Sequence, residues 1–215
     1  NDPKTEKCIG IKGQGAGVYT YNVGVTATMI GIDFSDCDDH LIKQTFGCTY
    51  NTFAIVGGKN GVMESCLCNP HFINRQNYAG MGYLDTKFAD VVAWKKYSSV
   101  SEGGVGGSEG FTELRDALLR NYCTMIEVRD AQNQAINNVF MYAPYELISV
   151  SNSTATLINT SADFVGMGSV YHIKNNSKVA IVNALRSAGD SIICDDTVTV
   201  DLYNRINTEI YYEGN

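Results

Sequence analysis

The sequence predicts a mainly β protein: an antiparallel β-sandwich or barrel-like domain with two or three short helices, with an α+β fold as the alternative. Three observations predict this class. Apolar and polar residues alternate from Tyr19 to Met29, the pattern of a strand with one buried face. Short apolar segments in the second half are separated by turn residues at intervals of roughly eight to twelve positions. Strictly alternating strand and helix segments are missing, which argues against a doubly wound parallel sheet.

In the first half, N-cap and acidic residues after Ser35 predict a short helix that ends at Gly47. Strands are expected at 49–56 and 62–68. An Asn-Gly pair lies between them, and both residue types tolerate positive φ, so we expect a hairpin turn there.

In the second half, helices are expected at 86–97 and after Thr112, on either side of a Gly-rich loop at 101–110. The segment 178–188 fits a strand or a helix, and no internal repeat of fixed period is visible. The remaining strands are expected at 123–129, 136–143, 146–151, 154–159, 169–174, 197–203 and 206–212. Since strand patterns lie on both sides of the loop, we expect an N-terminal arm at 1–17 and one β-rich domain at 18–215.

Charge and hydropathy restrict the partners. The net charge of the 215 residues is −7, and no run of Lys or Arg occurs, which argues against nucleic-acid binding. The longest uncharged stretch, Gly13 to Ile32, is long enough to span a membrane but mixes polar side chains with apolar ones. We therefore expect no membrane span.

Seven cysteines are scattered along the chain, which favours long-range disulfides in an oxidising compartment. An odd number leaves one thiol free or paired with another chain. The disulfide candidates are Cys8, Cys37, Cys48, Cys66, Cys68, Cys123 and Cys194. Three N-glycosylation sequons begin at Asn152, Asn159 and Asn175, in keeping with an extracellular or surface location.

Two metal sites can be drawn from the first third of the chain. Asp36, Asp38 and Asp39 form an acidic cluster that suits calcium, although the pattern of a calcium-binding loop is missing. The pair Cys37 and His40, with the segment from Cys66 to His71, offers zinc ligands, but disulfides or buried thiols are the favoured fate of these cysteines. The sequence predicts no cofactor, with calcium as the alternative.

No nucleophile-elbow or nucleotide-binding motif occurs, so the sequence assigns no catalytic residue and favours a non-catalytic protein. Tyrosine is enriched in recognition surfaces, and Tyr211 and Tyr212 are candidates for contact with a partner. The predicted function is an extracellular binding, adhesion or surface-assembly module, such as a filament or coat subunit, stabilised by disulfides. The partner would be a protein or a glycan, with self-association through the N-terminal arm and the odd cysteine.

Two alternatives stay open. One is a secreted hydrolase that uses a His/Asp or His/Cys site built on His40 or His172. The other is a cytoplasmic or viral β-rich protein with reduced thiols.

Overall fold

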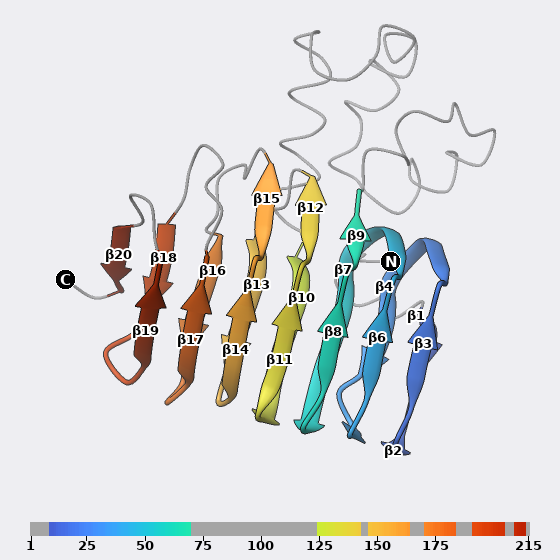
Figure 1. Cartoon of the computed structure of the whole chain (residues 1–215), viewed down its shortest axis with the longest axis horizontal. Helices are drawn as coiled ribbons and strands as arrows, with labels where there is room; N and C mark the ends of the chain where they lie inside the picture. Colours follow the sequence, from blue (N-terminus) through green and yellow to red (C-terminus); the bar gives the residue numbers. More distant parts are fainter. Residues whose placement is uncertain are drawn as a thin grey trace, which may run out of the picture.

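A computed structural model describes residues 9–69, 124–142, 146–163, 170–183, 191–204 and 209–213. The described chain forms a parallel β-solenoid of about six turns, without helices (Figure 1). Each turn pairs with the next in parallel register, so the predicted antiparallel sandwich or barrel and the α+β alternative are both wrong. The expected helix between Ser35 and Gly47 is also wrong, because short strands occupy this segment. The expected helices at 86–97 and after Thr112, and the Gly-rich loop, lie outside the described residues.

The strands form two long stacks and one short one. Sheet 1 consists of β1 (Ile9–Lys12), β4 (Gly24–Phe34), β7 (Phe46–Lys59), β10 (Thr124–Gln132), β13 (Glu146–Ser151), β16 (Tyr171–Lys174), β18 (Ser191–Cys194) and β20 (Glu209–Tyr212). Sheet 2 consists of β3 (Tyr19–Tyr21), β6 (Leu41–Lys43), β8 (Val62–Glu64), β11 (Gln134–Asn137), β14 (Thr154–Ile158), β17 (Lys178–Val182) and β19 (Thr199–Tyr203). A third stack of β9 (Leu67–Cys68), β12 (Phe140–Tyr142) and β15 (Ser161–Asp163) joins sheet 1 through β7, and β2 (Gly15–Ala16) pairs with β5 (Cys37–Asp38).

Single residues with positive φ turn the chain from one sheet to the next. In three successive turns, Asp39, Asn60 and Asn133 occupy the corner between sheet 1 and sheet 2. Asn and Asp enter this left-handed region more readily than other non-glycine residues, which explains why they recur here. At the far end of sheet 2, the chain also turns at residues with positive φ. These are Asn22, Gln44, Ser65, Asn138, Asn159, Asn183 and Asn204.

Hydrogen bonds between turns hold the corners in register. The backbone N–H of Asn60 donates to the Gln132 carbonyl at 2.9 Å. The Asn60 side-chain amide donates to Asp39 at 3.1 Å and accepts from the Asn133 amide at 2.9 Å, so one ladder links three turns. The Asn-Gly pair that suggested a hairpin therefore forms a solenoid corner.

The core lies between the sheets and repeats from turn to turn. In sheet 1, one inward column contains Ile32, Ala54, Ile126, Ile148, Tyr171 and Ile192, and in sheet 2 another contains Ile42, Met63, Ile136, Leu157 and Ile181. All of these are at most 2% exposed. Such columns place similar side chains on top of one another, so apolar burial is continuous along the axis.

The predicted strand across Tyr19 to Met29 is divided in two, because Asn22 forms a corner within it. Tyr19 and Tyr21 were expected on the buried face, but they point outward and are 72% and 57% exposed. A repeat does exist: corner residues such as Asn22, Gln44 and Ser65 follow one another at intervals of 22 and 21 positions. Residues 70–123 separate turns three and four in the sequence, and this interruption makes the repeat hard to recognise.

Candidate functional site: the polar rows of sheet 1

Two rows of polar residues cross the outer face of three neighbouring strands, β10, β13 and β16. The first row is Glu127, Ser149 and His172, and the second row is Arg129, Ser151 and Lys174. Their neighbours in the strands, including Ile148 and Val150, are fully buried, and strand alternation therefore directs the rows away from the core. We call these six residues the polar rows.

His172 lies between two carboxylates. Its Nδ1 is 2.9 Å from Oε1 of Glu146 at the start of β13, and its Nε2 is 3.5 Å from Oε1 of Glu213, just after β20. The hydrogen bond with Glu146 raises the pKa of His172 above its ordinary value of 6.5, against the opposing effect of burial. Glu146 thus fixes the ring and favours its protonated form.

The second ring nitrogen is directed at the edge of the site. Although Nε2 of His172 lies within ion-pair range of Glu213, it is buried and makes no hydrogen bond among the described residues. The side chain of Glu213 is 54% exposed, so this carboxylate is free to move in solvent. A ligand that displaces it would find a positioned N–H donor.

Glu127 and Arg129 form the opposite side of the rows. The hydroxyl of Thr52 donates to Oε1 of Glu127 at 2.7 Å, and Arg129 forms an ion pair with the same carboxylate. The Glu127 side chain is 18% exposed, whereas Arg129 is 53% exposed and reaches into solvent. The carboxylate is therefore the fixed member of this pair.

The site has closely spaced donors and acceptors but no excess of positive charge. Glu127, Glu146 and Glu213 match Arg129, Lys174 and, when it is protonated, His172, and Asp195 at the neighbouring corner adds a further negative charge. Adjacent strands are about 4.8 Å apart, so the six positions form a flat grid of polar groups. Two serine hydroxyls, each able to donate and to accept, occupy its centre.

His40, the other histidine considered for catalysis, is in the core and is 2% exposed. Its Nδ1 is 2.9 Å from the Cys37 carbonyl, its ring packs edge-on against Phe34, and burial lowers its pKa below 6.5. A group enclosed in this way has no access to a substrate in solvent. The geometry does not bring His40 and His172 together.

The predicted metal ligands contact the chain itself. Asp38 accepts a hydrogen bond from the Lys59 backbone and Asp39 accepts one from Asn60, while Asp36 is exposed. In the part of the chain that the structure describes, no group of three or more His, Cys, Asp or Glu residues is placed to hold a metal ion. Calcium binding stays a prediction, and His71, part of the zinc idea, lies outside the described residues.

The described cysteines form no disulfide with one another, so the predicted stabilisation by disulfides is wrong for them. Cys37, Cys48, Cys66, Cys68 and Cys194 are all buried and unbridged. Burial raises the pKa of both Cys66 and Cys194 to about 11. Cys8 and Cys123 lie outside the described residues. Parallel coils enclose these thiols in the core, where they act as small apolar side chains.

The three sequon asparagines lie at corners and all have positive φ. The side-chain amides of Asn152 and Asn175 donate to Asp130 and Ser151, and the side-chain oxygen of Asn159 accepts from Asn183. These residues thus have a structural part in the ladders, and their glycosylation stays a prediction.

Of the polar rows, only His172 was singled out from the sequence. The other members were missed, although the structure reveals a signal that identifies them. Glu127, Ser149 and His172 follow one another at intervals of 22 and 23 positions, and the second row repeats the same spacing. A search for polar residues at the solenoid period finds both rows.

No family model, curated protein or solved structure matches the chain. None of the described segments is a helix of the length and hydropathy needed to cross a membrane. The case for function therefore rests on the geometry of the polar rows.

Proposed function

We propose that the protein is a non-catalytic binding module that holds an extended, uncharged glycan against the polar rows. The observation that carries the proposal is the pair of in-register rows on three adjacent strands, with His172 fixed by Glu146 and its Nε2 lacking a hydrogen bond. A regular sheet presents these groups at a constant spacing, which suits a polymer more than a compact small molecule.

The chemistry of the rows favours a polyhydroxylated ligand. A sugar hydroxyl both donates and accepts, and it meets donors on Arg129, Lys174 and His172 beside acceptors on Glu127 and the two serines. Because the site has no excess of positive charge, a polyanion gains no net attraction from it. A neutral glycan needs no net charge in the site, and its hydroxyls can form hydrogen bonds with both the donors and the acceptors of the polar rows.

Electrophoresis in native gels that contain a soluble polysaccharide tests the proposal. We expect neutral glucans, mannans or xylans to retard the protein more than polygalacturonate does. Ser149→Trp places a large ring in the middle of the rows and should abolish the retardation. Its matched control is Thr156→Trp, which adds the same ring to the exposed outer face of sheet 2 in the same turn and should leave it unchanged.

Equal mobility of both tryptophan variants in every polysaccharide gel would contradict the proposal. Preference for polygalacturonate would contradict the argument from the charge of the site. Circular dichroism on both variants confirms that each remains folded.

The secreted hydrolase remains a second candidate because of one observation, the 2.9 Å contact between Glu146 and Nδ1 of His172. A carboxylate that orients an imidazole in this way is the arrangement of a general acid–base pair, although its partner is Glu and not the expected Asp or Cys. Release of reducing ends from a retarding polysaccharide, lost in His172→Gln, would establish hydrolysis. Binding without release supports the non-catalytic module.

An extracellular or surface location is part of the proposal, but the described cysteines give it no support because they are unbridged. The same thiols are buried, so they are not available to link chains. Cys8 and Cys123 lie outside the described residues, so self-association through the N-terminal arm and the odd cysteine stays a prediction.

A further inference from the structure

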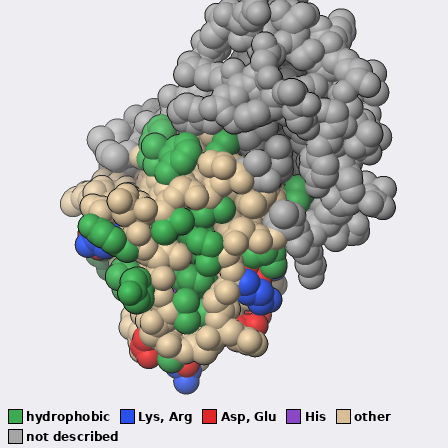
Figure 2. Space-filling model, turned by 90° about the vertical axis from the view of Figure 1, so that its right-hand side faces the viewer, with side chains coloured by type: hydrophobic (Ala, Val, Ile, Leu, Met, Phe, Trp, Pro, Cys, Tyr) green, Lys and Arg blue, Asp and Glu red, His purple; other side chains and the backbone are tan. Residues whose placement is uncertain are grey.

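Among the described residues, no element covers either end of the apolar core of the solenoid. Side chains in its inner turns are almost fully buried, whereas several apolar side chains of the first and last turns are only partly covered. At the first end they are Ile11, Val18 and Val23, and at the last end they are Val198, Val200, Leu202 and Ile210. Figure 2 looks onto the first end and shows hydrophobic side chains along the middle of its described part.

The backbone at both ends has free pairing capacity. Within the described residues, β1 pairs with β4 alone and β3 with β6 alone at the first end. At the last end, β20 pairs with β18 alone and β19 with β17 alone. Each end thus presents two parallel edge strands, and such edges accept a further strand readily.

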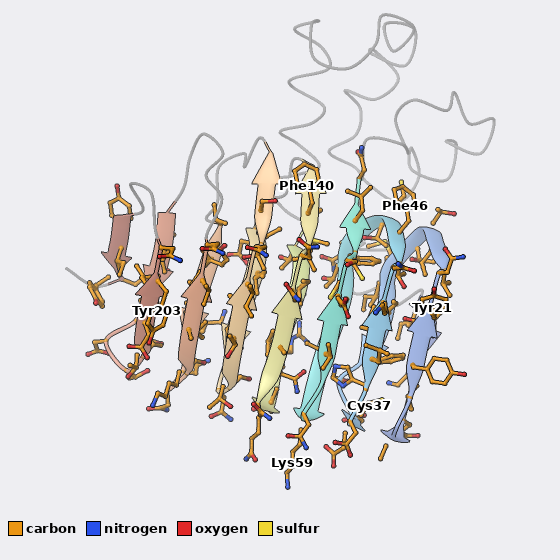
Figure 3. The ribbon with its side chains drawn as sticks, viewed as in Figure 1. Tyr21, Cys37, Phe46, Lys59, Phe140 and Tyr203 are labelled. Carbon is orange, nitrogen blue, oxygen red and sulfur yellow. The ribbon has the colours of Figure 1, made fainter. Side chains whose placement is uncertain are left out.

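The two ends match each other. Sheet register places Ile210 in the same column as Ile11, and Tyr203 in the same column as Tyr21. If the last turn of one copy lies on the first turn of another, every strand stays parallel. The apolar column of sheet 1 then continues from Ile210 to Ile11, and in sheet 2 Leu202 meets the buried Thr20. Tyr203 then faces Tyr21, an aromatic pair across neighbouring strands, and both rings are more than half exposed in the single chain (Figure 3).

Charge also distinguishes the two ends. Residues 9–23 of the first turn contain one charged residue, Lys12. The last turn, residues 191–204 and 209–213, contains five acidic residues and no basic one. Stacking would place Lys12 in the row of Tyr211 and diagonally across from Glu213, within reach of a long side chain. Two last turns would instead juxtapose acid with acid, and two first turns would juxtapose Lys12 with Lys12.

We propose that a second copy of this chain covers the end of the solenoid, last turn on first turn, and that the copies assemble head to tail. Such a contact joins two different surfaces, so each added copy leaves one end of either kind free, and growth continues into a filament. The inference does not depend on glycan binding, because the six residues of the polar rows lie on the side of the solenoid. Glu213, which faces His172, borders both surfaces.

Charge reversal at the two ends tests the proposal. Lys12→Glu leaves acid against acid at every junction, and Glu213→Lys leaves base against base, so each variant alone should need about tenfold more protein than wild type to assemble. In an equimolar mixture, the last turn of either variant meets a first turn of opposite charge. We therefore expect the mixture to regain filaments when followed by sedimentation velocity and negative-stain microscopy.

The mixture distinguishes an interface effect from a folding defect, because a variant that fails to fold is not rescued by its partner. Lys12→Glu also removes the ion pair with Asp33, whose side chain is only 10% exposed, so circular dichroism on the single variant must first show that it is folded. Lys59→Glu is the matched control, because Lys59 is exposed at a corner in the middle of the solenoid (Figure 3) and its reversal should not affect assembly.

Three results would overturn the proposal. Wild-type protein that stays monomeric at all accessible concentrations shows that something other than a second copy covers the ends. Growth that stops at a dimer indicates contact between like ends. Single variants that assemble as readily as wild type exclude the junction between Lys12 and Glu213.

Discussion

Replacement of Gly57 by alanine tests the stacking of turns directly. A Cβ atom at Gly57 would lie 2.0 Å from the carbonyl oxygen of Ser35 in the preceding turn, and 2.8 Å and 3.0 Å from its C and Cα atoms. All three are backbone atoms of a paired coil, so no side chain can rotate to relieve the clash. Overpacking typically costs 1–3 kcal/mol, and a backbone clash belongs at the upper end, so we expect a loss of about 3 kcal/mol.

Gly24→Ala is the matched control, because no atom lies within 4 Å of its added Cβ and its φ is not positive. This variant should be more stable than wild type by about 0.4–1 kcal/mol, since alanine restricts the unfolded chain. Urea unfolding followed by circular dichroism gives both values from the midpoint and slope. If Gly57→Ala unfolds at the wild-type midpoint, the register between β4 and β7 is wrong.

The remaining predictions concern the site and the core. His172→Gln should reduce stability most below pH 6.5, and the difference from wild type should shrink as pH rises through the raised pKa of His172; urea midpoints across this range that differ by a constant amount would contradict the pairing with Glu146. The thiols of Cys66 and Cys194, with pKa values of about 11, should resist a colorimetric thiol reagent in the native protein and react after denaturation. A mass change on reduction that maps to either cysteine would refute this. Leu157→Ala, at a fully buried position, should cost about 2–5 kcal/mol in urea unfolding, and a loss below about 1 kcal/mol would place Leu157 outside the core.

The sequence located most strands of the second half. Segments expected at 146–151 and 154–159 correspond closely to β13 and β14, and the ambiguous segment 178–188 contains strand β17. Alternation and β propensity are local, so they can be read without knowledge of the fold. Alternation and β propensity do not show which two strands pair or whether the pair is parallel or antiparallel, because both kinds of pairing are compatible with the same alternation of apolar and polar residues.

The corners were misread for a similar reason. Positive φ at Asn60 was correctly expected, but one such residue serves a hairpin or a solenoid corner equally well. Only the repetition of a positive φ at Asp39 and Asn133 distinguishes a solenoid corner from a hairpin. Residues 70–123 separate Asn133 from the other two corner residues in the sequence. The contact between Glu146 and His172 could not be predicted, because their separation of 26 positions does not equal the repeat.

The long separation between the third and fourth turns has a consequence for how the chain can change. Strands β7 and β10 pair in register, from Thr52 with Thr124 onward, although residues 70–123 lie between β9 and β10 in the sequence. Other turns close the same corner with connections as short as 143–145. For a flexible connection, closure entropy grows only with the logarithm of length, so lengthening one from 3 to 54 residues costs about 2–3 kcal/mol. We therefore expect that a peptide or a whole domain put in place of residues 70–123 would leave the alignment of the columns on either side unchanged.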